Sequence, residues 1–225
     1  MNAPSGDVQA VRIAPRGLEG FLGASESSQG LVIFAHGSGS GRFSPRNNRV
    51  ADGLRKAGLA TLLLDLLGPD EEDDRAKVFD IPLLASRLLE ATRWAAHQPG
   101  IGQLPVGYFG ASTGAGAALV AAADPEARVA AVVSRGGRPD LAGGALARVR
   151  APTLLIVGGR DTPVIALNRQ ALSAMHAEKN LVIVPGATHL FEEPGTLERV
   201  TELATDWFVR HLVPPTYAKE GHHGL

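Results

Sequence analysis

The sequence predicts an α/β fold in which a mostly parallel, doubly wound sheet is flanked by helices on both faces. Three observations support this prediction. Short apolar runs without polar alternation, typical of strands buried on both faces, recur along the chain. Amphipathic helical patterns separate these runs, and Gly, Asp, Ser or Pro follows nearly all of them. The length of 225 residues suits one domain of this kind.

The expected strands differ in strength. Six continuous apolar runs predict the buried parallel strands: 31–35, 60–64, 106–109, 129–133, 154–157 and 181–184. Two weaker runs, 8–13 and 18–22, precede them. We expect these two to form an antiparallel hairpin at the edge of the sheet.

Helical periodicity marks the segments between the strands. Five apolar residues share one helical face: Ile81, Leu84, Leu88, Ala91 and Ala95. Asp80 is placed to cap that helix and Pro99 to end it. Residues 50–57 predict an earlier helix that stops at Gly58, and an apolar stripe over 197–208 predicts the last one.

The domain organisation follows from the spacing of these elements. We expect residues 1–213 to form a single domain and residues 214–225 a flexible tail. Only 134–151 separates two predicted strands at the place where larger proteins of this architecture insert a cap. That length holds a loop and one helix, so no cap domain is expected. The acidic run 70–74 is expected to be a solvated loop.

Composition and charge exclude several function classes. The formal net charge is -1, so no global field favours nucleic acid or an anionic membrane. There is no cysteine, which excludes disulfides, thiolate catalysis and cysteine metal sites. No apolar run approaches the ~18 residues of a membrane span, and residues 1–7 do not resemble a secretory signal. We expect a soluble, cytoplasmic protein that binds neither nucleic acid nor membranes.

The most specific motif is GASTG at residues 110–114. It follows the predicted strand 106–109 and opens an alanine-rich helical segment, 115–123. A serine on such a strand-to-helix turn is held in a strained conformation at the carboxyl edge of the sheet. The two glycines avoid clashes there, and the helix amino terminus favours developing negative charge. Ser112 is therefore predicted to be a catalytic nucleophile.

A serine hydroxyl needs a neighbouring base. His189 lies in the loop just after the predicted strand 181–184, at the edge of the sheet where Ser112 is expected. His36 precedes a glycine-rich turn and is expected to brace that loop. Three other histidines fall within or beside helices and are read as packing or surface residues: His97, His176 and His211.

The acid that orients the base should also follow a strand. Asp161 follows the strand 154–157, and Asp140 follows the strand before it. We favour Asp161, with Asp140 as the alternative. The order Ser112, Asp161, His189 is the one expected for a hydrolase of this architecture, whereas Asp65 precedes the serine and breaks that order.

Acyl transfer also needs two donors aimed at the oxyanion of the tetrahedral intermediate. The backbone N–H of Thr113, just after the nucleophile, is expected to be one of them. The glycine-rich segment 37–41, which follows the strand 31–35, is expected to supply the other. The N–H of Ser38 is the candidate.

With these motifs the chain resembles the α/β-hydrolase superfamily, and within it the dienelactone-hydrolase-like branch. The resemblance runs from about residue 31 to residue 211 and rests on FAHGSGSGR, FGASTGAG, VGGRDTPV and GATHLFEEPG. It implies an α/β-hydrolase fold and activity without a metal ion or an organic cofactor. It also implies the same site: Ser112 as nucleophile, His189 as base, Asp161 as acid, and Ser38 and Thr113 as oxyanion donors. Dienelactone hydrolases use a cysteine nucleophile, so the serine implies a small carboxylesterase.

The sequence thus predicts a serine hydrolase that cleaves small carboxylic esters through an acyl-enzyme and acts as a monomer or homodimer. The alternatives are an acyltransferase or thioesterase on the same triad, and a catalytically silent binding protein of the same fold. Arg42 and Arg135 lie close in sequence to the predicted site loops. They either bind an anion on the substrate or form ion pairs that hold the loops.

Overall fold

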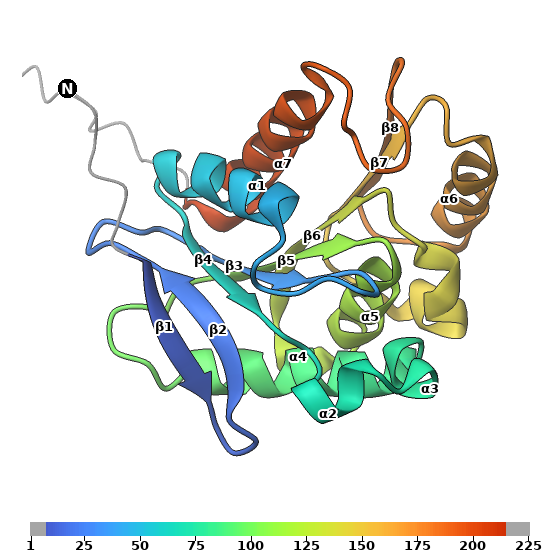
Figure 1. The fold of residues 1–225 in the computed structure, drawn as a ribbon. Helices are drawn as coiled ribbons and strands as arrows, with labels where there is room; N and C mark the ends of the chain where they lie inside the picture. The colour runs from blue at the N-terminus through green and yellow to red at the C-terminus, as the bar shows by residue number, and fades with distance from the viewer. Residues whose placement is uncertain (1–7, 215–225) are drawn as a thin grey trace, which may run out of the picture.

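The structure is a computed structural model that describes residues 8–214 (Figure 1). Eight strands form one sheet, in the order β1-β2-β4-β3-β5-β6-β7-β8. The strands are β1 (Val8–Ile13), β2 (Leu18–Gly23), β3 (Leu31–Ala35), β4 (Ala60–Leu64), β5 (Val106–Ala111), β6 (Val129–Arg135), β7 (Thr153–Gly158) and β8 (Lys179–Val184). All eight predicted strands are present. The predicted tail, apart from residue 214, lies outside the described residues.

Strand direction confirms the predicted sheet. β1 pairs antiparallel with β2, and β2 pairs antiparallel with β4. All other neighbours are parallel. β3 lies between β4 and β5, so the strand order reverses there. In open α/β sheets, sites form outside the carboxyl ends of the strands at such a reversal.

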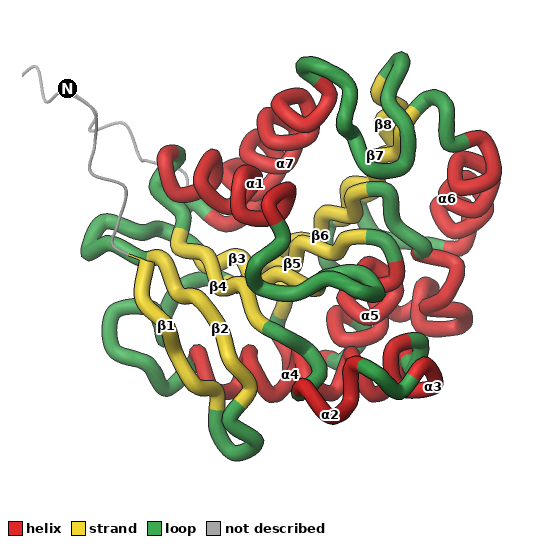
Figure 2. The backbone as a smooth tube through the Cα atoms, viewed as in Figure 1, coloured by secondary structure: helices red, strands yellow, loops and turns green. Residues whose placement is uncertain are grey.

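Two groups of helices cover the two faces of the sheet (Figure 2). α1 (Pro45–Lys56) and α7 (Thr196–Leu212) pack against each other on one face. α4 (Ile81–Ala95) and α5 (Thr113–Ala122) pack together on the other, which α6 (Thr162–Ala174) extends. Each face buries its own apolar cluster, which is why the strands read as continuous apolar runs.

The prediction that the acidic run 70–74 forms a loop is wrong. The segment contains the short helix α2 (Pro69–Glu72) and leads into α3 (Arg75–Val78). Glu71 accepts hydrogen bonds from the N–H of Gly68 and from the guanidinium of Arg87. These partners fix a segment whose charge alone favours solvent.

Two 3-10 helices complete the chain, η1 (Pro125–Ala127) and η2 (Pro139–Arg148). η2 fills the connection between β6 and β7, where the sequence leaves no room for a cap domain. Among the described residues no helix is both long enough and apolar enough to cross a membrane.

Candidate active site

Ser112 stands on a sharp turn between β5 and α5. It is the N-cap of α5, with φ 50° and ψ −122°, a conformation that side chains rarely adopt. A Cβ on Gly110 would lie 2.5 Å from the Cα of Ala115, and one on Gly114 would lie 2.2 Å from the carbonyl oxygen of Ala35. Strand and helix therefore meet too closely for any residue but glycine at these two positions.

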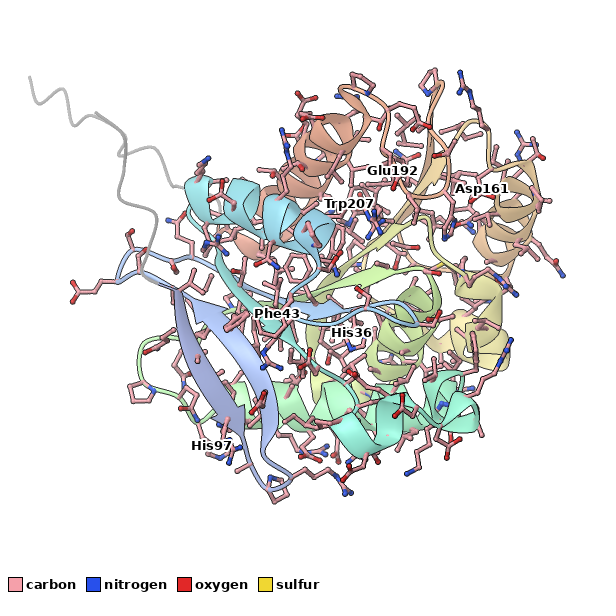
Figure 3. The ribbon with its side chains drawn as sticks, in the orientation of Figure 1. His36, Phe43, His97, Asp161, Glu192 and Trp207 are labelled. Atoms are coloured by element: carbon pink, nitrogen blue, oxygen red, sulfur yellow. The ribbon has the colours of Figure 1, made fainter. Side chains whose placement is uncertain are left out.

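His189 and Asp161 meet at the carboxyl edge of the same sheet. His189 follows β8, and Asp161 follows β7 as the N-cap of α6 (Figure 3). The His189 Nδ1 and the Asp161 Oδ2 are 2.6 Å apart. An ionised carboxylate only accepts hydrogen bonds, so Nδ1 carries the proton and Nε2 remains as the basic nitrogen.

The alternative acid has a different partner. Both carboxylate oxygens of Asp140 accept from the guanidinium of Arg138, each at 2.8 Å. Of the two candidate acids, the structure brings Asp161 to His189 and holds Asp140 in a local bidentate ion pair. His97, by contrast, lies on the far side of the molecule from Asp161 (Figure 3).

The end of β6 connects the serine to the histidine. The N–H of Ser112 donates to the carbonyl oxygen of Arg135 at 3.3 Å. A Cβ on Gly136 would lie 2.9 Å from the carbonyl oxygen of His189. Within residues 8–214 no hydrogen bond joins the side chains of Ser112 and His189. Such bonds are often long without substrate and tighten when it binds.

The loop after β3 packs directly on the serine. A Cβ on Gly37 would lie 2.9 Å from the Cβ of Ser112. The N–H of Ser38 donates to the Thr113 Oγ1 at 3.0 Å. Thr113 begins α5, so its own N–H has no acceptor within the helix. The structure thus brings the loop of Ser38 against Thr113, but the N–H of Ser38, predicted to bind an oxyanion, here donates to the Thr113 hydroxyl.

His36 braces this loop from below. Its Nδ1 donates to the carbonyl oxygen of Gly37, and its Nε2 accepts from the N–H of Leu66, both at 2.9 Å. Burial lowers the pKa of His36, which keeps the ring neutral and able to accept the Leu66 bond. Figure 3 shows His36 beneath the loop that carries Phe43.

The two candidate arginines have opposite surroundings. Arg42 forms ion pairs with Asp65 and Glu19, and its guanidinium lies 4.4 Å from the ring centre of Phe43. Arg135 is buried and has no acidic partner among the described residues. A groove of about 1130 Å³ runs along the loop after β3, and its walls include Ser38, Arg42 and Arg46.

A second cavity, of about 450 Å³, lies at the amino ends of β3 and β5, where Leu31 and Val106 line it. The site described above lies at the carboxyl ends of the same strands. The first groove reaches the loop of Gly37 and Ser38 at that edge of the sheet, whereas this cavity lies at the opposite ends of the strands.

Comparison with known proteins identifies the family. The model of the dienelactone hydrolase family matches residues 18–212. The chain belongs to the dienelactone hydrolase family. A solved dienelactone hydrolase from Anabaena variabilis is 56% identical, with a TM-score of 0.89 over 93% of this chain and 100% of that one.

A second sequence relative and a second solved structure are also similar to this chain. A Mycobacterium tuberculosis protein provisionally named a phosphoribosyl transferase is 62% identical over 209 residues, or 93% of this chain. The chain spans 47% of the length of that protein. Est1E from Butyrivibrio proteoclasticus, solved with ferulic acid bound, shares the fold at 18% identity and a TM-score of 0.77, over 90% of this chain and 99% of that one.

Proposed function

We propose that this member of the dienelactone hydrolase family is a carboxylesterase that works through a covalent acyl-enzyme. One observation carries the proposal: the 2.6 Å pair of His189 and Asp161 lies at the same sheet edge as the strained Ser112. A base oriented by a carboxylate, at the same sheet edge as a half-buried serine on a strained turn, is the arrangement that activates a hydroxyl nucleophile.

The reaction proceeds in two steps. The Ser112 Oγ attacks the ester carbonyl while the His189 Nε2 takes its proton. The oxyanion of the tetrahedral intermediate accepts from the N–H of Thr113, and from the N–H of Ser38 once that group exchanges its bond to the Thr113 Oγ1 for the oxyanion. When the intermediate collapses, the C–O bond to the alcohol breaks and His189 returns the proton to it. Water, deprotonated by His189, then attacks the acyl-enzyme and releases the acid and Ser112.

Asp161 supports both steps without being protonated. It holds the Nδ1 proton of His189 and stabilises the imidazolium that forms in each step. Only η2 connects β6 and β7, so no cap covers this edge of the sheet, which favours short, accessible esters.

Hydrolysis of p-nitrophenyl esters of increasing acyl length tests the proposal. We expect Ser112→Ala to lower kcat by a factor on the order of 10⁶, as in comparable triad enzymes. Ser173→Ala is the matched control, because that hydroxyl is exposed and bonds only within α6. A fluorophosphonate probe should label the wild type and the control but not Ser112→Ala.

Failure of both assays would contradict the proposal. A wild type that neither cleaves any of the esters nor takes up the probe would favour a binding protein of this fold. Cleavage that yields an ester of an added alcohol in preference to the free acid would favour acyl transfer.

Phosphoribosyl transfer, the activity in the relative's name, is not proposed for this chain. That name belongs to a protein about twice as long, and the Ser112, His189 and Asp161 geometry supports nucleophilic attack on an acyl group.

A further inference from the structure

The feature that the proposed mechanism does not use is the side chain of Arg135. It is 6% exposed, and its Nη2 donates to the Asn47 Oδ1 at 3.1 Å. Its Nε is buried without any partner. Within residues 8–214 no carboxylate pairs with it. A buried charge is normally paired, so an unpaired guanidinium here calls for an anion.

A second cation lies close to it. Arg46 also has a buried Nε without a partner. Burial and the nearby charge of Arg46 lower the pKa of Arg135 to about 10, so Arg135 remains charged at neutral pH. The Nη1 of Arg46 is 3.4 Å from the Glu192 Oε1, and those side chains are 36% and 63% exposed. Such an exposed, long ion pair contributes little and is easily exchanged.

Both guanidinium-bearing side chains contact or belong to the first turn of α1: Arg46 is part of it, and Arg135 bonds to its Asn47. Ser44 caps this helix, Arg46 is its second residue, and Asn47, the partner of Arg135, is its third. The partial positive charge of a helix amino terminus adds to that of the two guanidinium groups. In Figure 3, Glu192 is drawn near Trp207 of α7, the helix that packs against α1.

The backbone of Arg135 lies between Ser112 and His189. The carbonyl oxygen of Arg135 holds the N–H of Ser112, and the next residue, Gly136, packs against His189. Arg135 therefore reaches from the backbone between nucleophile and base toward α1. A group bound by its guanidinium would belong to the same molecule as the carbonyl attacked at Ser112.

We propose that Arg135, Arg46 and the amino end of α1 bind a phosphate monoester group on the ester substrate. The proposal rests on the proposed esterase function and names its substrate class. A phosphate monoester carries about −1.5 to −2 charges at neutral pH and has three acceptor oxygens. It can neutralise both guanidinium groups, whereas a carboxylate, with one charge, neutralises only one. Arg46 exchanges Glu192 for the phosphate when the substrate binds.

Selectivity among three p-nitrophenyl esters tests this site. The acids are methoxyacetic acid, which is neutral, succinic acid, with one free carboxylate, and phosphoglycolic acid, with a phosphate. We expect the wild type to favour the phosphate ester in kcat/KM. Arg135→Met and Arg46→Met should each lower the ratio of phosphate to neutral ester by about 10- to 100-fold, the effect of losing a hydrogen bond to a charged group.

The neutral ester and a matched variant serve as controls. Arg49→Met removes one cation from the same helix, but Arg49 pairs with Glu198 at the surface, so the ratio should not change. Glu192→Gln should raise the ratio, because it removes the carboxylate that competes for Arg46. An unchanged ratio in Arg135→Met would overturn the proposal. An Arg135-dependent preference for the succinate ester would overturn the choice of phosphate.

Titration of inorganic phosphate into Ser112→Ala by calorimetry separates this proposal from the esterase itself. We expect binding that Arg135→Met abolishes, whether or not any ester is cleaved. Arg135-dependent binding with no ester cleavage would contradict the esterase and keep the anion site. Ester cleavage without phosphate binding would contradict the anion site alone. Phosphate that binds without competing with the phosphoglycolate ester would overturn its assignment to the substrate.

Discussion

Arg42, in the loop after β3, and Arg135, at the end of β6, differ in how their charges are satisfied. Arg42 contacts two carboxylates and lies over an aromatic ring. Arg135 has one amide partner and is more deeply buried. A paired arginine holds its surroundings together, whereas a buried arginine without an anion lowers the stability of the protein until one binds. The first is a structural residue, and the second marks a binding site.

Breaking the ion pair between Arg42 and Asp65 should have the largest effect on stability. Asp65→Ala leaves the guanidinium of Arg42 without its less exposed partner; the two side chains are 17% and 15% exposed. We expect the free energy of unfolding to fall by about 2–4 kcal/mol, slightly less than for a fully buried pair. Urea denaturation measures this. Asp52→Ala, which breaks a surface pair with Lys56, should change it by less than about 1 kcal/mol.

Substitution of Arg135 should raise the stability of the protein, whereas substitution of Asp65 lowers it. Arg135→Met removes an unpaired buried charge and keeps much of the side-chain volume, so we expect the free energy of unfolding to rise by about 1–3 kcal/mol. The loss of the hydrogen bond to Asn47 offsets part of the gain. The same denaturation experiment decides the point. A loss of stability like that of Asp65→Ala would make Arg135 a structural residue and end the contrast.

The smallest effect concerns His36, which braces the loop that carries Arg42. Burial lowers its pKa in the folded protein, so below about pH 6.5 the unfolded chain binds the proton first. Stability from this group is complete above that pH and is lost as the pH falls, by at most about 1.4 kcal/mol per pH unit. Between pH 6.5 and 5, His36→Gln should lose less stability than the wild type. If the free energy of unfolding fell equally steeply with pH in His36→Gln and in the wild type, the structural role of the neutral His36 ring would be contradicted.

Local motifs made much of this structure predictable. The GASTG turn and the loops with Asp161 and His189 each follow a recognisable strand, so the residues of the candidate triad could be chosen from the sequence. The strand ends could not be placed as well. β5 and β6 continue through Ala111 and Arg135 because these residues pair across the sheet, although glycine and polar residues end the apolar runs.

The proposed anion-binding site of Arg135, Arg46 and the first turn of α1 shows what the sequence alone could not predict. Asn47 and Arg135 are 88 positions apart, and they meet only because the fold brings the first turn of α1 to the end of β6. Arg42 and Arg135 looked equivalent in the sequence, since both follow a strand near a glycine-rich loop. Their difference arises from partners such as Glu19 and Asp65, which only the folded chain brings to one of them.

The antiparallel hairpin also has a consequence for the chemistry. β2 carries Glu19, whose carboxylate binds Arg42 and whose carbonyl oxygen accepts from the N–H of Asp65. Asp65 in turn accepts from the backbone N–H of Arg42. The hairpin is therefore an anchor for the loop that bears Ser38. Loosening the hairpin should shift that donor and slow acylation although no residue of the triad has changed.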